Sequence, residues 1–243
     1  MARVMFVLGV LAVSLIGAFH AEAEDRVASV GMSPSSSESE AAAKRDMLVD
    51  LIHALDIATN SSTKIVLRPF ARSLMDTAAG LADFHIPFIQ DDGSAAPEGL
   101  RYVMEVDFGQ IPFVIYSRKS NPFDAKTIGD AREVETESSH ESFFPFAVRA
   151  TNCVICSLDK VLRGWTDALI VPADVVDPLL SEPKYKEIHR ALFKEYPVRP
   201  LVPANADSTA TRRYLIEGVA RLKETGELWK ITRHDVVYSD WQP

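Results

Sequence analysis

The sequence predicts an α/β protein that forms one large domain or two small lobes. Its first five segments follow the order strand–helix–strand–helix–strand within about 65 residues, which is typical of parallel βαβ units. The length of 243 residues is sufficient for two small lobes. A polar stretch at 118–131 contains Pro122 and Gly129 and suits a crossing from one lobe to the other.

The first 23 residues are interpreted as a signal peptide. Arg3 gives a positively charged start, residues 4–19 are almost wholly apolar, and the tripeptide AEA at 21–23 matches a cleavage site. The apolar run is shorter than the roughly 20 residues of a membrane span, so cleavage is favoured over an uncleaved anchor. We therefore expect export to the periplasm and a mature chain that begins near Glu24.

The first half of the chain alternates between strand and helix. A short apolar run at 27–32 and a Ser-rich stretch at 33–40 precede an amphipathic helix, whose apolar residues recur at i, i+3 and i+4. The expected elements, in order, are a helix over 41–59, a strand over 63–70, a helix over 72–80 ended by Gly80, a strand over 82–89, a polar loop over 91–99, and strands over 101–106 and 110–117.

The second half repeats this alternation more loosely. Pro178 and Pro183 weaken one of its helical segments, because proline cannot donate a backbone hydrogen bond. The expected elements are a strand ending near Val148 or Arg149, a helix over 153–163 ended by Gly164, a strand over 167–173, a helical segment over 175–186, one or two strands within 187–204, a helix over 209–224, and a short turn or helix over 228–231.

Composition argues against several classes of function. The net charge is −8 and no basic block occurs, so no nucleic acid is expected as a partner. Two cysteines are too few for a small disulfide-stapled scaffold. No Ser–His–Asp order, H-E-x-x-H motif or phosphate-binding Gly-rich loop occurs, and we expect no enzyme, no cofactor and no metal site.

Several motifs together resemble the type II periplasmic solute-binding proteins of the family 3, or amino-acid-binding, type. In that family a first-lobe strand ends in a Pro-aromatic-x-Arg turn, and a Gly-x-x-Asp step leads into the next strand. Pro69, Phe70, Arg72, Gly80 and Asp83 hold these positions within 65–89. The stretches 159–171 (DKVLRGWTDALIV) and 222–231 (LKETGELWKI) resemble the family's second-lobe Gly-x-x-Asp-Ala step and its closing helix, and 134–161 resembles a small subgroup with a C-x-x-C helix.

The resemblance implies two α/β lobes that two hinge strands join, each lobe with a mixed, mostly parallel sheet. Lobe 1 would comprise 24–116 and 199–243, and lobe 2 would comprise 118–196. It implies a monomeric receptor that closes on a small-molecule solute and serves a membrane transporter permease or a sensor. Family members that bind α-amino acids use a Thr-x-x-Arg motif, whereas residues 90–106 offer only Arg101. We therefore expect a small polar or anionic solute instead of a standard amino acid.

Five residues are candidate ligand contacts. Arg72 and Phe70 follow a strand end, which is where α/β proteins bind ligands, and the Arg72 guanidinium suits a forked contact with a carboxylate. Arg149 holds the corresponding position in lobe 2, with Glu135 and His140 before it. The alternative for each is an ordinary surface or packing role. For Asp83 and Asp167 we favour hydrogen bonding within turns over ligand contact, and for Phe143, Phe144 and Phe146 a place in the core.

Cys153 and Cys156 form a C-x-x-C motif at a predicted helix start. Three interpretations are open: a local disulfide, which an oxidising compartment favours; a redox-active thiol pair; and two metal ligands, of the four that structural zinc needs. The second is the alternative function, a periplasmic thiol/redox or enzymatic protein on the same scaffold. A partner protein of an export or respiratory system, with no solute in its cleft, is a third hypothesis.

Overall fold

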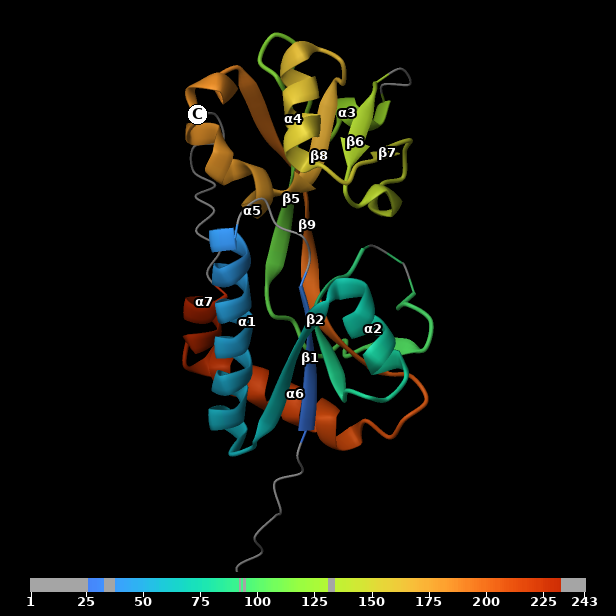
Figure 1. Cartoon of the computed structure of the whole chain (residues 1–243), viewed down its shortest axis with the longest axis vertical. Coiled ribbons are helices and arrows are strands. Elements are labelled where there is room, and N and C mark those ends of the chain that lie inside the picture. The colour runs from blue at the N-terminus through green and yellow to red at the C-terminus, as the bar shows by residue number, and fades with distance from the viewer. Residues whose placement is uncertain (1–25, 33–37, 92, 94, 131–133, 233–243) are drawn as a thin grey trace, which may run out of the picture.

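The chain forms two lobes, which the long strands β5 (Gln110–Arg118) and β9 (Ile188–Pro203) join (Figure 1). The computed structural model describes residues 26–32, 38–91, 93, 95–130 and 134–232, so the predicted signal peptide at 1–23 lies outside the described residues. The α/β class and the two-lobed architecture with mostly parallel sheets are confirmed.

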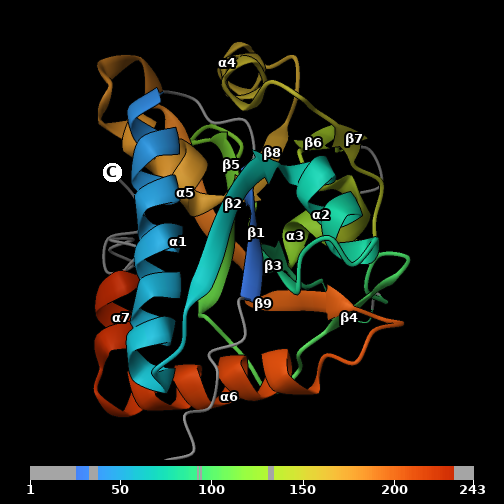
Figure 2. The ribbon, with the colours of Figure 1, turned by 60° about the horizontal axis from the view of Figure 1, so that its bottom comes forward.

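Lobe 1 packs helices against a sheet. Its elements are β1 (Arg26–Met32), α1 (Glu38–Thr59), β2 (Thr63–Pro69), α2 (Phe70–Ala78), β3 (Phe84–Ile89), β4 (Leu100–Tyr102), α6 (Thr209–Glu224) and α7 (Glu227–Ile231). The predicted apolar stripe of α1 is buried at Leu48, Leu51, Ile52 and Leu55. Helix α6 packs across α1, as Figure 2 shows, and Gly218 allows the approach, since a Cβ there would lie 2.7 Å from Leu55 Cδ2.

Lobe 2 is smaller and has shorter elements. These are α3 (Thr127–Asp130), β6 (Thr136–Ser138), the 3₁₀ turn η1 (Glu141–Phe143), β7 (Arg149–Ala150), α4 (Val154–Arg163), β8 (Ala168–Pro172), α5 (Ala173–Val176), and the 3₁₀ turns η2 (Asp177–Ser181) and η3 (Pro183–Tyr185). Helix α4 ends at Gly164 in the left-handed region (φ 72°), as predicted, because glycine adopts this conformation without steric cost.

The two lobes repeat one strand order. In lobe 1 the parallel strands lie in the order β2-β1-β3, and β9 joins antiparallel at β3. In lobe 2 the parallel strands lie in the order β7-β6-β8, and β5 joins antiparallel at β8. Strands β5 and β9 pair with each other along most of their length and so connect both sheets. They are the hinge strands that the resemblance implied.

The segment 187–204, in which one or two strands were expected, forms one continuous 16-residue strand, β9, which pairs first with β5 and then with β3 and β4. Another strand prediction needs correction. The strand expected over 101–106 ends at Tyr102. The Val106 amide donates to the Val103 carbonyl at 3.0 Å and closes a turn, and the Arg199 guanidinium donates to the carbonyls of Met104 and Val106 at 2.7 Å each, so the chain leaves the ladder here.

The helical segment expected over 175–186 is present, but it is divided into three short pieces. Residues 173–176 form α5, and the remainder forms the 3₁₀ turns η2 and η3. Pro178 and Pro183 each stand at the start of one turn. Proline has no N–H to continue an α-helix, so each residue starts a new turn instead.

Candidate functional site

The carboxyl ends of the parallel strands in the two lobes face each other. Strands β1 and β2 run toward lobe 2, and β8 runs toward lobe 1, with α5 at the junction (Figure 1). The carboxyl ends of parallel strands are the usual ligand site of α/β proteins. We call the carboxyl ends of the parallel strands in each lobe the lobe 1 edge and the lobe 2 edge. The region between these two edges, which we call the interlobe site, is therefore the candidate functional site.

An ion pair crosses the interlobe site. Lys44 in the second turn of α1 places Nζ 3.5 Å from Asp174 Oδ2 at the start of α5. The other oxygen, Asp174 Oδ1, is buried and has no hydrogen-bond partner among the described residues. Both side chains are partly exposed, at 35% for Lys44 and 24% for Asp174. Neither residue was predicted, because the pair joins positions 130 residues apart.

The lobe 1 edge carries an aromatic group around His85. The Phe70 ring lies edge-on to His85 with centroids 5.2 Å apart and stacks on Phe88 at 6.0 Å. His85 is fully buried, Nδ1 lies 2.6 Å from Ser73 Oγ, and Nε2 lies 3.1 Å from the Pro87 carbonyl. A carbonyl only accepts, so Nε2 carries the proton and Ser73 donates to Nδ1. Burial lowers the pKa of His85 to about 4, against the opposing effect of the Pro87 bond.

Arg72, the predicted carboxylate contact, lies in the first turn of α2, and an ion pair with Asp76 positions its guanidinium. Its Nε is 2.7 Å from Asp76 Oδ1, and Arg68 Nε is 3.2 Å from the other Asp76 oxygen. The Asp76 side chain is largely buried, whereas Arg72 is exposed. The described contacts of Arg72 use Nε alone. Its two Nη groups, the forked end of the guanidinium, therefore keep their donors for another partner.

Two predicted lobe 2 contacts meet each other. Arg149 Nη2 lies 2.9 Å from Glu135 Oε2 and 3.8 Å from Glu137 Oε1. Glu135 and Arg149 are both more than half exposed, whereas the Glu137 side chain is only 6% exposed. Among the described residues no hydrogen bond or ion pair joins these residues to Phe70 or Arg72. The structure thus brings the candidates together within each lobe.

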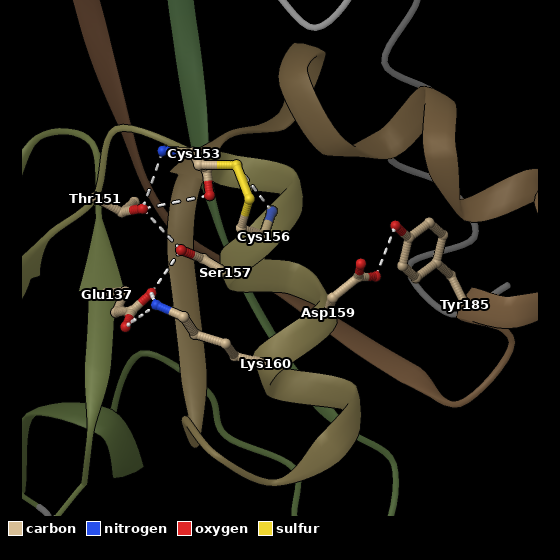
Figure 3. The surroundings of a disulfide bond; sticks show 8 residues. All are labelled: Glu137, Thr151, Cys153, Cys156, Ser157, Asp159, Lys160 and Tyr185. Atoms are coloured by element: carbon tan, nitrogen blue, oxygen red, sulfur yellow. Dashed lines mark hydrogen bonds and ion pairs between the residues drawn. A yellow bond between two sulfur atoms is a disulfide. The ribbon is translucent and has the colours of Figure 1, made fainter.

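Glu137 is the centre of a network that sequence reasoning missed (Figure 3). Its carboxylate accepts from Ser157 Oγ at 2.5 Å and from Lys160 Nζ at 3.0 Å. It also accepts from Thr166 Oγ1 at 3.4 Å. Burial raises the pKa of Glu137, but the bonds from Ser157 and Lys160 and the nearby Arg149 charge outweigh it, and the pKa is lowered. The carboxylate therefore ties β6 to α4.

His140 lies between the aromatic core of lobe 2 and the interlobe ion pair. Its ring is edge-on to Phe113 at 5.2 Å and to Phe143 at 5.1 Å, and Nδ1 is 2.9 Å from Ser139 Oγ. Burial lowers the pKa of His140 to about 4, and the Lys44 charge adds to this, while Glu141 and Asp174 oppose it. At neutral pH the ring is therefore uncharged and offers one donor and one acceptor. The predicted core position of Phe144 is confirmed, while Phe143 and Phe146 pack against that core.

Cys153 and Cys156 form a disulfide, as the first of the three interpretations predicted. It lies at the first turn of α4, directly after β7 and therefore at the lobe 2 edge (Figure 3). Among the described residues no group of three or more His, Cys, Asp or Glu side chains is placed to hold a metal ion.

Asp83 and Asp167 have the structural role that was favoured for them. Asp83 accepts from the Val27 amide at 2.7 Å and donates its own amide to the Val27 carbonyl at 2.8 Å. Asp167 makes the same two contacts with Glu135, at 3.0 and 2.9 Å. Each Gly-x-x-Asp step therefore holds the start of the first parallel strand of its lobe.

Arg199 is a further residue without a sequence signal. In addition to the two carbonyls of the 104–106 segment, it donates from Nε to Gln90 Oε1 at 2.6 Å. It thereby holds the end of β3 to the segment that leads into hinge strand β5. Away from the interlobe site, a cavity of about 200 Å³ lies between residues 107–109 and α7. In the part of the chain that the structure describes, no helix has the length and apolarity that a membrane crossing requires.

No protein-family model matches the sequence, and no curated protein matches it either. Solved structures do match the fold. The ligand-binding core of GluR0 with L-glutamate has a TM-score of 0.61 at 10% identity, over 86% of this chain and 97% of that one. The amino acid ABC transporter substrate-binding protein AbpA from Streptococcus pneumoniae, bound to L-arginine, has 0.56 at 12%, over 85% and 92%.

A histidine kinase sensor domain with similarity to periplasmic binding proteins also matches, with a TM-score of 0.55 at 12% identity, over 86% of this chain and 94% of that one. At such identities the likeness concerns the fold. It confirms the type II periplasmic binding-protein fold that the motifs predicted.

Proposed function

We propose that this chain, which has the type II periplasmic binding-protein fold, is a non-enzymatic receptor that captures a small polar or anionic solute at the interlobe site. The observation that carries this proposal is the arrangement of the strand ends: the carboxyl edges of both parallel sets face each other across the hinge strands β5 and β9. Such an arrangement encloses a ligand when the lobes rotate about the hinge.

The geometry of Arg72 favours an anionic solute. Asp76 holds the guanidinium through Nε, at 2.7 Å, and the Nη fork is left for a carboxylate. On the lobe 2 side, Arg149 and the uncharged His140 add donors, with Glu135 as the partner that positions Arg149. Phe70 contributes an apolar surface beside Arg72. We assign these five residues to the binding surface.

The fold neighbours include a transporter substrate-binding protein and a sensor domain, which supports either destination for the solute. We assign the exported chain to the periplasm, after cleavage of residues 1–23, as a monomer with a transporter permease or a sensor as its membrane partner. Lobe 1 comprises 24–116 and 199–243, and lobe 2 comprises 118–196.

The test is a search for the solute on the protein purified without refolding. Denaturing mass spectrometry identifies a co-purified small molecule, and a thermal-shift panel tests organic, keto and amino acids. A solute present at 100 times its Kd stabilises the protein by about 2.7 kcal/mol, which raises the Tm by roughly 5–10 °C for a chain of this size. If no molecule co-purifies and none of the panel raises the Tm, the proposal fails.

Arg72→Ala and Arg68→Ala form a matched pair for the site itself. Both variants remove one arginine from Asp76, so both disturb that carboxylate. Only Arg72→Ala removes the proposed solute contact, and we expect it to abolish the Tm rise that the identified acid causes. Equal loss in both variants would show that Arg72 acts only through Asp76.

A further inference from the structure

The Cys153–Cys156 disulfide has two unequal sulfurs. Cys153 is the N-cap residue of α4, and its Sγ accepts the amide N–H of Cys156 at 3.3 Å. Cys153 is partly buried, whereas Cys156 is exposed. Cys156 is therefore the residue that a nucleophile from solvent reaches more readily, and Cys153 Sγ occupies a position where a negative charge is stabilised by a backbone N–H and by the helix dipole.

The first turn of α4 is tied to the lobe 2 edge beside the disulfide (Figure 3). The Cys153 amide donates to Thr151 Oγ1 at 3.2 Å, and Thr151 Oγ1 lies 2.8 Å from Ser157 Oγ. Ser157 in turn donates to the buried Glu137 carboxylate. The disulfide and the Glu137 network thus hold the same turn, one covalently and one through hydrogen bonds.

We propose that Cys153–Cys156 is a thiol–disulfide exchange site for a dithiol, and that its redox state sets the rigidity of the lobe 2 edge of the interlobe site. In the first step a thiolate of the dithiol attacks the exposed Cys156 Sγ. The sulfur–sulfur bond breaks, its electron pair leaves with Cys153 Sγ, and a mixed disulfide forms at Cys156.

In the second step the second thiolate of the dithiol attacks the dithiol sulfur that is bonded to Cys156. The mixed disulfide breaks, and Cys156 leaves as a thiolate. The dithiol is oxidised by two electrons to a cyclic or internal disulfide, and the protein is reduced by two. The protons that the dithiol lost balance those that the two protein thiols take up at their own pKa values. Exchange favours attack on the accessible sulfur and departure of the more stable thiolate, which are Cys156 and Cys153 here.

Reduction leaves the fold in place but loosens the edge. The Glu137 carboxylate still accepts hydrogen bonds from Ser157 and Lys160, because neither bond involves a sulfur atom. The loop at 151–153 loses its covalent link to the first turn of α4. This proposal concerns the disulfide alone and does not require that the interlobe site binds a solute.

The experiment uses the full mature chain, with dithiothreitol as the dithiol probe. We expect complete reduction without denaturant, measured as a gain of two alkyl groups by mass spectrometry, with the far-UV circular dichroism unchanged. Hydrogen exchange at 151–157 should become severalfold faster, while α6 at 209–224 serves as the internal control and stays unchanged. A disulfide that is reduced only after denaturation, or exchange that does not change at 151–157, would overturn the proposal.

The single variants Cys156→Ser and Cys153→Ser separate the two sulfurs. In Cys156→Ser the remaining Cys153 thiol should alkylate with a midpoint at least about one pH unit below the ordinary value of roughly 8.5. In Cys153→Ser the exposed Cys156 thiol, which lacks the amide contact of Cys153 Sγ, should alkylate with a midpoint at higher pH than that of Cys153. Equal midpoints would contradict the assigned leaving group. If either variant does not fold, alkylation rates of the two thiols in the reduced native chain give the same comparison by peptide mapping.

Discussion

The Lys44 ammonium lies 3.5 Å from the Asp174 carboxylate, and this ion pair joins α1 of lobe 1 to α5 of lobe 2. Residues between lobes that a hinge connects are the ones whose contacts change on opening. The pair therefore stabilises the arrangement in which the strand ends of the two lobes face each other.

Removing the ion pair should favour a more open arrangement. We expect Lys44→Ala and Asp174→Ala to raise the open population, by at most about fivefold, because a partly exposed pair contributes roughly 0.2–1 kcal/mol. Small-angle scattering measures this as a larger radius of gyration. Lys230→Ala, which removes an exposed pair within α7, is the control and should change nothing. An unchanged radius in both interlobe variants would contradict a role in closure.

Glu137 and Glu135 offer a matched test of burial, because both lie near Arg149. Glu137→Gln should reduce the free energy of unfolding by about 1–3 kcal/mol, since the 6% exposed carboxylate holds Ser157 and Lys160. Glu135→Gln should change it by less than about 0.5 kcal/mol, because its pair with Arg149 is exposed. Urea unfolding measures both. Similar losses in the two variants would contradict the assigned centre of the network.

Acid should destabilise the protein through His85. Its folded pKa of about 4 lies below the unfolded value of 6.5, so the unfolded chain binds more protons between these values. The stability that His85 contributes is complete above pH 6.5 and is lost as the pH falls toward 4, by up to about 3 kcal/mol.

The comparison of His85→Gln with wild type isolates this effect. In His85→Gln the slope of unfolding free energy between pH 6.5 and 4 should become shallower than in the wild type. Urea unfolding at several pH values provides the slopes. An unchanged slope in His85→Gln would show that the wild-type His85 imidazole binds protons equally in the folded and the unfolded chain.

Gly31 leaves no room for a side chain beside the lobe 1 edge. A Cβ there would lie 2.6 Å from His85 Cε1 and 3.0 Å from Phe70 Cδ2. Because His85 is fully buried and bonded at both nitrogens, we expect Gly31→Ala to destabilise the fold by about 1–3 kcal/mol. Gly129→Ala is the control, since its Cβ would lie 3.9 Å from the nearest ring atom. Equal thermal midpoints for the two variants would show that Phe70 and His85 shift to accommodate the new methyl group without loss of stability.

Local signals predicted most of the elements. The apolar period of α1 and the Gly164 end of α4 each depend on residues within one or two turns, and the structure places both helices close to the expected bounds. Helix α2 runs two residues earlier than predicted, from Phe70 to Ala78, and Gly80 follows its C-cap Ala79. The errors arise where backbone partners are distant in sequence. Beyond Tyr102 the chain turns, and Arg199 donates to the carbonyls of Met104 and Val106 in that turn; no pattern near residue 102 indicates this distant partner.

The sequence by itself therefore determined the alternation of strands and helices, the Gly-x-x-Asp steps and the C-x-x-C spacing, because each follows from neighbours along the chain. Only the tertiary structure decided which charges meet. It placed Lys44 against Asp174 and distinguished buried Glu137 from exposed Glu135. It also paired Arg72 Nε with Asp76, which leaves the Arg72 Nη groups for another partner. Burial and charge pairing depend on how separate elements pack, and residue type and spacing do not specify that.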